Sequence, residues 1–140
     1  MNFREDPREL EDVKVNMKDN IVKFKKNNTV YISLDPEMQA CEDNSIALMN
    51  LAGFLRDFAG LEVKSAVNNK TFAEENGMNY ADCENSPYNT VIYINSGNET
   101  SISEIGNCYQ LIYSDCEILE VTEKFMLVIL ENYMSYFVRE

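Results

Sequence analysis

The chain has 140 residues with 24 acidic and 12 basic side chains, and it contains neither histidine nor tryptophan. A chain of this length forms one domain with a real core, and its 45% hydrophobic content is too high for a disordered protein. The net charge of −12 argues against nucleic acid and anionic membranes as partners, because both need a basic surface. The absence of histidine removes the usual general base and the commonest metal ligand.

The acidic excess is confined to one part of the chain. Residues 1–26 hold seven basic and six acidic side chains, whereas residues 27–140 hold five and eighteen. We predict a flexible segment over residues 1–12 and a single globular domain over 13–140. Neither a signal peptide nor a membrane span is expected, since the longest apolar run, Phe125–Leu130, is far below the ~20 residues that a bilayer requires. The chain is therefore expected to be cytosolic, or a mature ectodomain without its leader.

Three short strands are expected first. Residues 13–17 alternate apolar and polar side chains, which is the pattern of a half-buried strand. Residues 21–25 and 29–34 follow as further strands, separated by polar turns. Together they predict a β-meander.

A βαβ unit is expected next. A helix over 45–59 follows an N-cap at Asp43 or Asn44, and Gly60 stands where a helix-ending glycine belongs. A strand over 61–67 then pairs in parallel with strand 29–34. The helix carries an apolar stripe at helical spacing, formed by Leu48, Leu51, Ala52, Leu55, Phe58 and Ala59.

The second half begins with a short helix, which Thr71 and Glu74 open as a capping box and which ends at Asn76-Gly77. A strand is expected over 90–95. Strands 100–105 and 108–113 form a hairpin around Gly106-Asn107.

A second capping box, Ser114 to Glu117, opens a last helix over 115–137. The predicted fold is α/β, with α+β as the alternative. It is a mixed sheet of six or seven strands with two main packed helices, in which a βαβ unit precedes a hairpin and a long helix.

The last helix is apolar over a wide arc and leaves only a narrow polar stripe. One interpretation is a central helix buried on more than one side by a curved sheet. The other is a dimer or partner interface. The candidate interface residues are Leu119, Met126, Leu130, Tyr133 and Phe137.

Cys41, Cys83, Cys108 and Cys116 are widely spaced and form no C-x-x-C motif, so the sequence supports neither zinc nor a redox motif. Buried free thiols and two disulfides both remain open. If the strands run as predicted, Cys41 and Cys116 lie at one edge of the sheet and Cys83 and Cys108 at the other. The favoured pairing is therefore Cys41–Cys116 with Cys83–Cys108. A Cys108–Cys116 bridge would have to span a whole strand, roughly 17 Å.

Three N-x-[ST] sequons, at Asn27, Asn69 and Asn98, fall in predicted turns or loops where glycans can attach. Together with the even number of cysteines, they favour a secreted protein.

Other candidate chemistry is limited to polar loops. Oxygen ligands for Ca²⁺ or Mg²⁺ occur in two acidic loops, but neither has EF-hand spacing, and a solvated loop is the alternative. Tyr80 and Tyr88 lie in the second of these loops and are candidates for a binding surface. No pair of carboxylates is singled out for glycoside hydrolysis. The loop residues are Asp35, Glu37, Glu42 and Asp43, and then Asn79, Asp82, Glu84 and Asn85.

Residues 90–130 resemble the end of S-layer-like and other cell-surface domains of archaea. The resemblance is carried by a strand (VIYIN), a hairpin (IGNCYQLIY) and a helix with an acidic start (EILEVTEKFMLVIL). A similar helix-strand element, NSIALMNLAGFLRDFAGLEV, lies upstream. The resemblance implies an extracytoplasmic structural or interaction domain, with no catalytic residues to transfer.

The first functional hypothesis is a non-enzymatic, extracellular or cell-surface domain that binds a protein partner or forms a homodimer. It implies no cofactor, no metal and no small-molecule substrate. The second is a cytoplasmic acidic binding or regulatory protein with free cysteines. The third is a carboxylate- or metal-dependent hydrolase.

Overall fold

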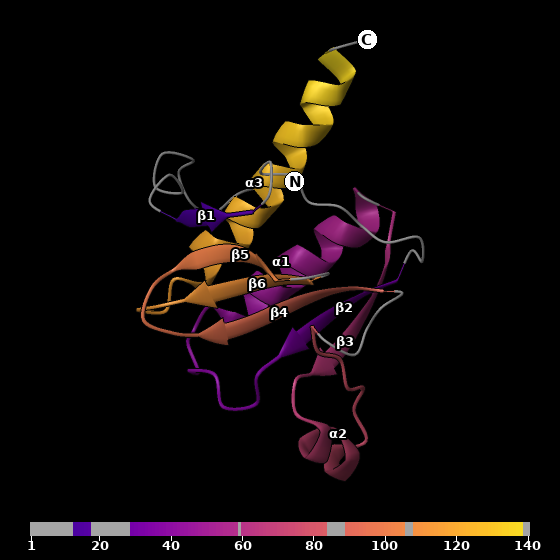
Figure 1. Ribbon diagram of the computed structural model, residues 1–140, viewed down its shortest axis with the longest axis vertical. Coiled ribbons are helices and arrows are strands. Elements are labelled where there is room, and N and C mark those ends of the chain that lie inside the picture. The colour runs from indigo at the N-terminus through magenta and orange to yellow at the C-terminus, as the bar shows by residue number, and fades with distance from the viewer. Residues whose placement is uncertain (1–12, 18–28, 59, 84–88, 106–107, 139–140) are drawn as a thin grey trace.

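The structure is a computed structural model that describes residues 13–17, 29–58, 60–83, 89–105 and 108–138, with the backbone alone for 132–138. These residues form a mixed six-stranded sheet and three helices, which confirms the predicted α/β fold (Figure 1). The predicted flexible segment 1–12 and strand 21–25 lie outside the described residues. In chain order the elements are β1 Lys14–Asn16, β2 Thr29–Leu34, α1 Asn44–Asp57, β3 Glu62–Val67, α2 Lys70–Asn76, β4 Thr90–Ser96, β5 Ser101–Ile105, β6 Cys108–Tyr113 and α3 Ile118–Val138.

The strands lie in the order β1-β5-β6-β4-β2-β3. Strands β6, β4, β2 and β3 are mutually parallel, and β5 is antiparallel to β6. The predicted βαβ unit is confirmed, because β2 pairs with β3 in parallel and α1 connects them. The predicted hairpin of β5 and β6 is also confirmed, although its turn, 106–107, is outside the described residues.

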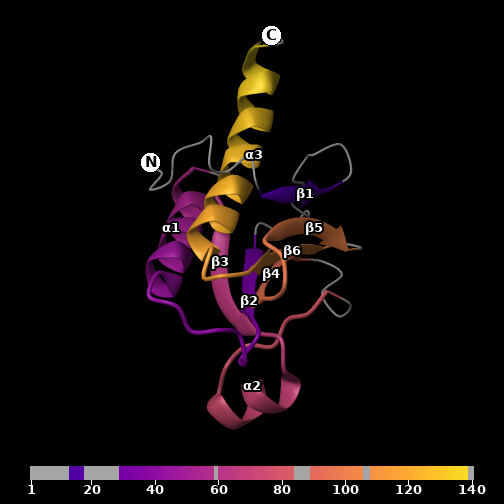
Figure 2. The ribbon, with the colours of Figure 1, turned by 90° about the vertical axis from the view of Figure 1, so that its left-hand side faces the viewer.

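Helices α1 and α3 pack together on one face of the sheet (Figure 2). After β3 the chain crosses back over β2 to reach β4, so this connection runs in the opposite direction from the first. Parallel crossovers are right-handed, and a reversed direction therefore places the connection on the opposite face. Ala81 in this connection does pack there, against Ala66 and Val91.

The predicted β-meander is wrong. Strand β1 pairs in parallel with β5 at one end of the sheet, while β2 lies between β4 and β3 near the other end. The alternation in residues 13–17 identified a strand, but it did not indicate which other strand would pair with it. Val15 of β1 is paired with Ile102 of β5, and Ile102 is completely buried. The apolar side of β1 therefore packs beside β5.

Both predicted capping boxes are absent. Helix α2 starts two residues earlier than predicted because the Asn69 side chain, and not that of Thr71, accepts a hydrogen bond from the backbone N–H of Phe72 at 2.9 Å. Helix α3 starts at Ile118 because Asp115 and Cys116 both have left-handed backbone angles, φ 51° and 59°. The Glu117 carboxylate accepts instead from the Thr100 hydroxyl at 2.8 Å. Gly77 ends α2 as predicted, with φ 62°. Helix α1 instead ends at Asp57, and Gly60, with φ 68°, lies three residues beyond its last helical residue.

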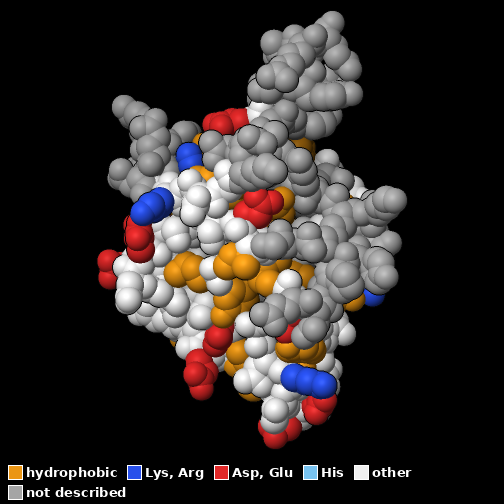
Figure 3. Space-filling view, in the orientation of Figure 1, with side chains coloured by type: hydrophobic (Ala, Val, Ile, Leu, Met, Phe, Trp, Pro, Cys, Tyr) orange, Lys and Arg blue, Asp and Glu red, His pale blue; other side chains and the backbone are white. Residues whose placement is uncertain are grey.

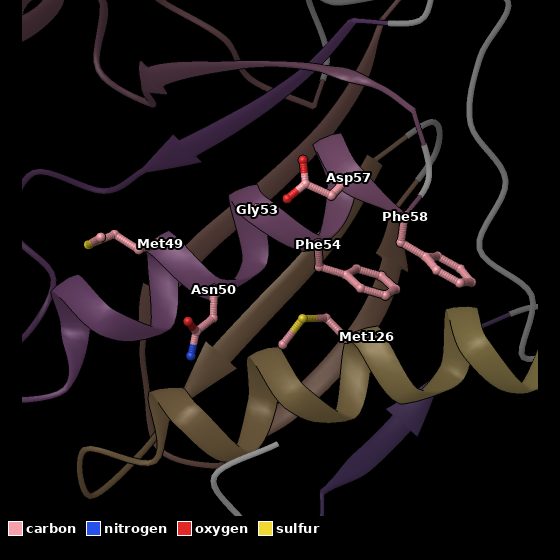
Figure 4. Close-up of a pocket in the computed structure, with 7 residues that line it drawn as sticks. All are labelled: Met49, Asn50, Gly53, Phe54, Asp57, Phe58 and Met126. Atoms are coloured by element: carbon pink, nitrogen blue, oxygen red, sulfur yellow. The ribbon is translucent and has the colours of Figure 1, made fainter. Parts of the chain in front are cut away.

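Helix α3 is a central helix as far as Leu130. On one flank Phe125 contacts Tyr109 of the sheet, with ring centroids 5.7 Å apart. On the other flank Met126 faces α1 (Figure 4). Beyond Leu130 the helix extends past the sheet and past α1 (Figures 1 and 2).

Gly97 follows β4 where two backbones approach closely. Its N–H donates to the carbonyl oxygen of Tyr113 at 2.9 Å, and an added Cβ would lie 2.6 Å from the Cγ2 of Ile112. We expect Gly97→Ala to lower the free energy of unfolding by about 1–3 kcal/mol, since the branched Ile112 side chain has little room to move.

Urea denaturation measures this effect, and Gly53→Ala in α1 is the matched control. An added Cβ at Gly53 has no atom within 4 Å, so alanine should raise stability by about 0.5–1 kcal/mol through its helix propensity. Equal effects of the two substitutions would contradict the close approach at Gly97.

Candidate functional site

The four cysteines form two disulfides, in the pairing that the sequence analysis favoured. Cys41 before α1 is bonded to Cys116 before α3, with Cα atoms 5.6 Å apart. Cys83 is bonded to Cys108 of β6, with Cα atoms 5.3 Å apart. The first bond therefore joins the starts of the two large helices, and the second fixes the connection after α2 to the sheet.

These crosslinks are a major contribution to stability. They close loops with sequence separations of 75 and 25 residues. Loop-closure entropy in the unfolded chain gives each a stabilisation of about 3–4 kcal/mol, larger for the longer loop. The first bond also holds the turn at Asp115 and Cys116, whose left-handed backbone costs about 1–2 kcal/mol per residue.

An apolar hollow with a volume of about 390 Å³ lies between α1 and α3 (Figure 4). We call it the α1–α3 groove. The rings of Phe54 and Phe58 stack at 5.0 Å along it. Met49 is 72% exposed and Phe58 40% exposed, which is unusual for large apolar side chains. The groove is lined by Met49, Asn50, Gly53, Phe54, Asp57, Phe58 and Met126.

The sequence analysis missed this groove because it assigned Phe58 to the core stripe of the helix. The α1 helix ends at Asp57, so Phe58 lies just past the last turn and turns toward the groove. Met49 is not on the core stripe of α1. Helical spacing therefore predicts only that it is exposed, and does not indicate that it lines a groove.

The candidate interface residues of α3 differ in how far they are buried. Leu119 and Met126 are buried within the domain, so these two do not form an exposed interface as predicted. Leu130 is half-buried against the core. The side chains of Tyr133 and Phe137 lie outside the described part of the structure.

The first acidic loop is organised by hydrogen bonds of its own. Asp35 follows β2 and accepts hydrogen bonds from the backbone N–H of Glu37 at 2.8 Å and from the Tyr93 hydroxyl at 3.0 Å. Asp43 occupies the N-cap position of α1 without a side-chain cap bond. Within the described ranges, no set of three or more histidine, cysteine or acidic side chains is arranged to hold a metal ion.

The second acidic loop, which contains Asn79 and Asp82, lies on the face of the sheet opposite α1 and α3. The Asn79 side chain donates to the carbonyl oxygen of Ser65 at 3.0 Å, and the Tyr80 hydroxyl donates to Asp82. Glu84, Asn85 and Tyr88 are outside the described residues. Tyr80 remains exposed beside a polar cleft.

The sequons differ in their surroundings. Asn98 is exposed in the turn between β4 and β5. Asn69 is exposed, and its side-chain oxygen already caps α2. Asn27 lies outside the described residues.

An acidic cluster surrounds the start of α3. Burial raises the pKa of the Glu120 carboxyl, and the neighbouring carboxylates of Glu117, Glu123 and Asp43 raise it further. Glu123 is itself buried on α3. A carboxyl group with a raised pKa in the folded state disfavours folding once it ionises.

No protein-family model and no curated protein sequence matches the chain. None of the helices in the described part of the chain has the length and hydrophobicity needed to span a membrane.

We expect Glu120→Gln to raise the unfolding temperature at pH 7, by an amount corresponding to less than about 1 kcal/mol, because it removes a partly buried charge among carboxylates. The gain should disappear below the ordinary pKa of 4.5, where Glu120 is protonated in both the folded and the unfolded chain. Thermal unfolding at pH 7 and pH 3.5 checks this. Glu75→Gln, at an exposed position on α2, is the control, and a pH-independent gain at Glu120 would contradict the electrostatic cause.

Proposed function

We propose that the chain is a non-enzymatic, disulfide-stabilised extracytoplasmic domain that works by protein–protein contact. Two structural disulfides support the compartment, because such bonds persist in oxidising environments and are rare in the cytosol. The proposed resemblance of residues 90–130 to archaeal cell-surface domains agrees with it. The alternative is a cytoplasmic acidic regulatory protein with free thiols.

The main support for a protein–protein contact is the α1–α3 groove, together with the apolar residues that continue from it along α3. We propose that a second copy of this chain occupies it, because Met126 of the groove is followed at helical spacing by Leu130, Tyr133 and Phe137. Two copies related by a two-fold axis can place the end of each α3 in the groove of the other.

The lengths of the two elements match. Residues 131–138 of α3 extend about 12 Å, and the groove runs about 13 Å along α1 from Met49 to Phe58. Among the described residues that line the groove, Asp57 is the only charged one, so the apolar positions of α3 would meet little charge there. Two copies of an acidic chain repel each other elsewhere, so an apolar contact is the surface that allows them to associate.

Size-exclusion chromatography with light scattering tests the second copy. The oxidised chain should approach twice the monomer mass of 16.1 kDa as its concentration rises. Phe58→Ser and Met49→Glu should each shift it to the monomer, because they remove apolar area or place a charge in the contact.

Helix α2 and its end offer matched controls on another part of the surface. Phe72 is 38% exposed and Met78 is 43% exposed, close to the exposure of Phe58. Phe72→Ser and Met78→Glu should leave the mass unchanged. A monomer at all concentrations, or equal effects of both sets, would contradict the proposed contact.

Alkylation of the protein in its native cells tests the compartment. Cells are quenched with acid, the denatured protein is then alkylated with iodoacetamide at mildly alkaline pH without a reductant, and peptides are identified by mass spectrometry. We expect none of the four cysteines to be alkylated before reduction and all four afterwards. Four alkylated cysteines before reduction would support the cytoplasmic alternative.

A further inference from the structure

A second hollow lies on the opposite face of the sheet from α1, where Figure 3 shows hydrophobic side chains gathered in the middle of the surface. We call it the polar cleft. Its volume of about 340 Å³ is at the small end of the range for ligand pockets, which is about 300–1,000 Å³. The lining residues come from three strands and two connections: Asn68, Tyr80, Asp82, Cys83, Tyr93, Ile105 and Gln110.

The cleft lies over the middle of the sheet. Tyr93 is the central residue of β4 and pairs with Gln110 in the neighbouring strand β6, and Asn68 follows the carboxyl end of β3.

The polar groups of the cleft are held in place before any ligand arrives. The Tyr93 hydroxyl donates to Asp35 at 3.0 Å and accepts from the Asn95 side chain at 3.0 Å. The Asn68 side chain contacts the same hydroxyl. The side-chain oxygen of Gln110 accepts a hydrogen bond from the Ser103 hydroxyl, and this bond fixes the orientation of the Gln110 side-chain amide. Fixed partners reduce the entropy that binding would cost.

The lining selects for a neutral, hydroxyl-rich ligand. Among the described residues that line it, Asp82 is the one charged side chain, and none of them is a basic side chain that could pair with a phosphate or carboxylate. Two amides and a carboxylate offer planar pairs of donors and acceptors that match adjacent hydroxyl groups. Tyr80 and Ile105 are exposed at the cleft and offer apolar contact for the C–H face of a ring.

From this geometry we propose that the polar cleft binds a neutral sugar ring. The Gln110 and Asn68 amides and Asp82 bind its hydroxyl groups, and the Tyr80 ring packs on its apolar face. The Cys83–Cys108 bond fixes one wall, because Cys83 lines the cleft and Cys108 is part of β6. The site is on the other side of the sheet from the α1–α3 groove and does not depend on a second copy.

Amide chemical shifts of the ¹⁵N-labelled, oxidised chain test the proposal during titration with methyl glucoside, methyl mannoside and methyl galactoside. At least one should shift the signals of Asn68, Tyr93 and Gln110, with a dissociation constant of about 1–10 mM for so small a ligand. Gln110→Leu, which removes the amide and keeps the volume, should weaken that binding about tenfold.

The matched control is Gln39→Leu, at an exposed position outside the cleft, and it should leave binding unchanged. Its hydrogen bonds in the described structure are made by its backbone. The unfolding midpoints of both variants show that they are folded. Absence of shifts with all three glycosides up to 100 mM would overturn the proposal. Binding of methylammonium at the same residues without glycoside binding would overturn it in favour of a cation site.

Discussion

A parallel sheet must be covered on both faces, and this chain meets that requirement unequally. Helices α1 and α3 bury one face of β6, β4 and β2 completely. The other face is covered by the connection between α2 and β4, which the Cys83–Cys108 bond attaches to the sheet. This second layer leaves part of the face uncovered, and the polar cleft lies there.

On the face of the sheet covered by α1 and α3, the Cys41–Cys116 bond holds the covering layer together. Each cysteine lies just before a large helix, so the bond fixes the start of α1 relative to the start of α3. The two helices separate along the groove that begins at Met49 and ends at Phe58. One face of the sheet therefore carries the apolar groove, and the opposite face carries the polar cleft.

The net charge of −12 has a clearer meaning in this arrangement. Acidic side chains of the described residues lie mainly in loops and at the start of α3, where Glu120 is surrounded by like charges. The α1–α3 groove and the polar cleft each contain a single acidic residue. An acidic coat that is interrupted at these two places keeps other contacts weak and leaves these surfaces available.

Residue patterns along the chain were enough to locate the elements and their local connections. Periodicity located β2, α1, β3 and the hairpin, and the strand directions that followed from them were enough to give both disulfide pairs. The neighbours across the sheet were set by the folding of the whole chain. Strand β1 lies beside β5, Leu119 and Met126 are buried in the domain core, and the polar cleft brings Asn68, Tyr93 and Gln110 together. Side-chain spacing reports which side of an element is apolar, whereas the partner of that side is chosen by packing between residues far apart in the chain.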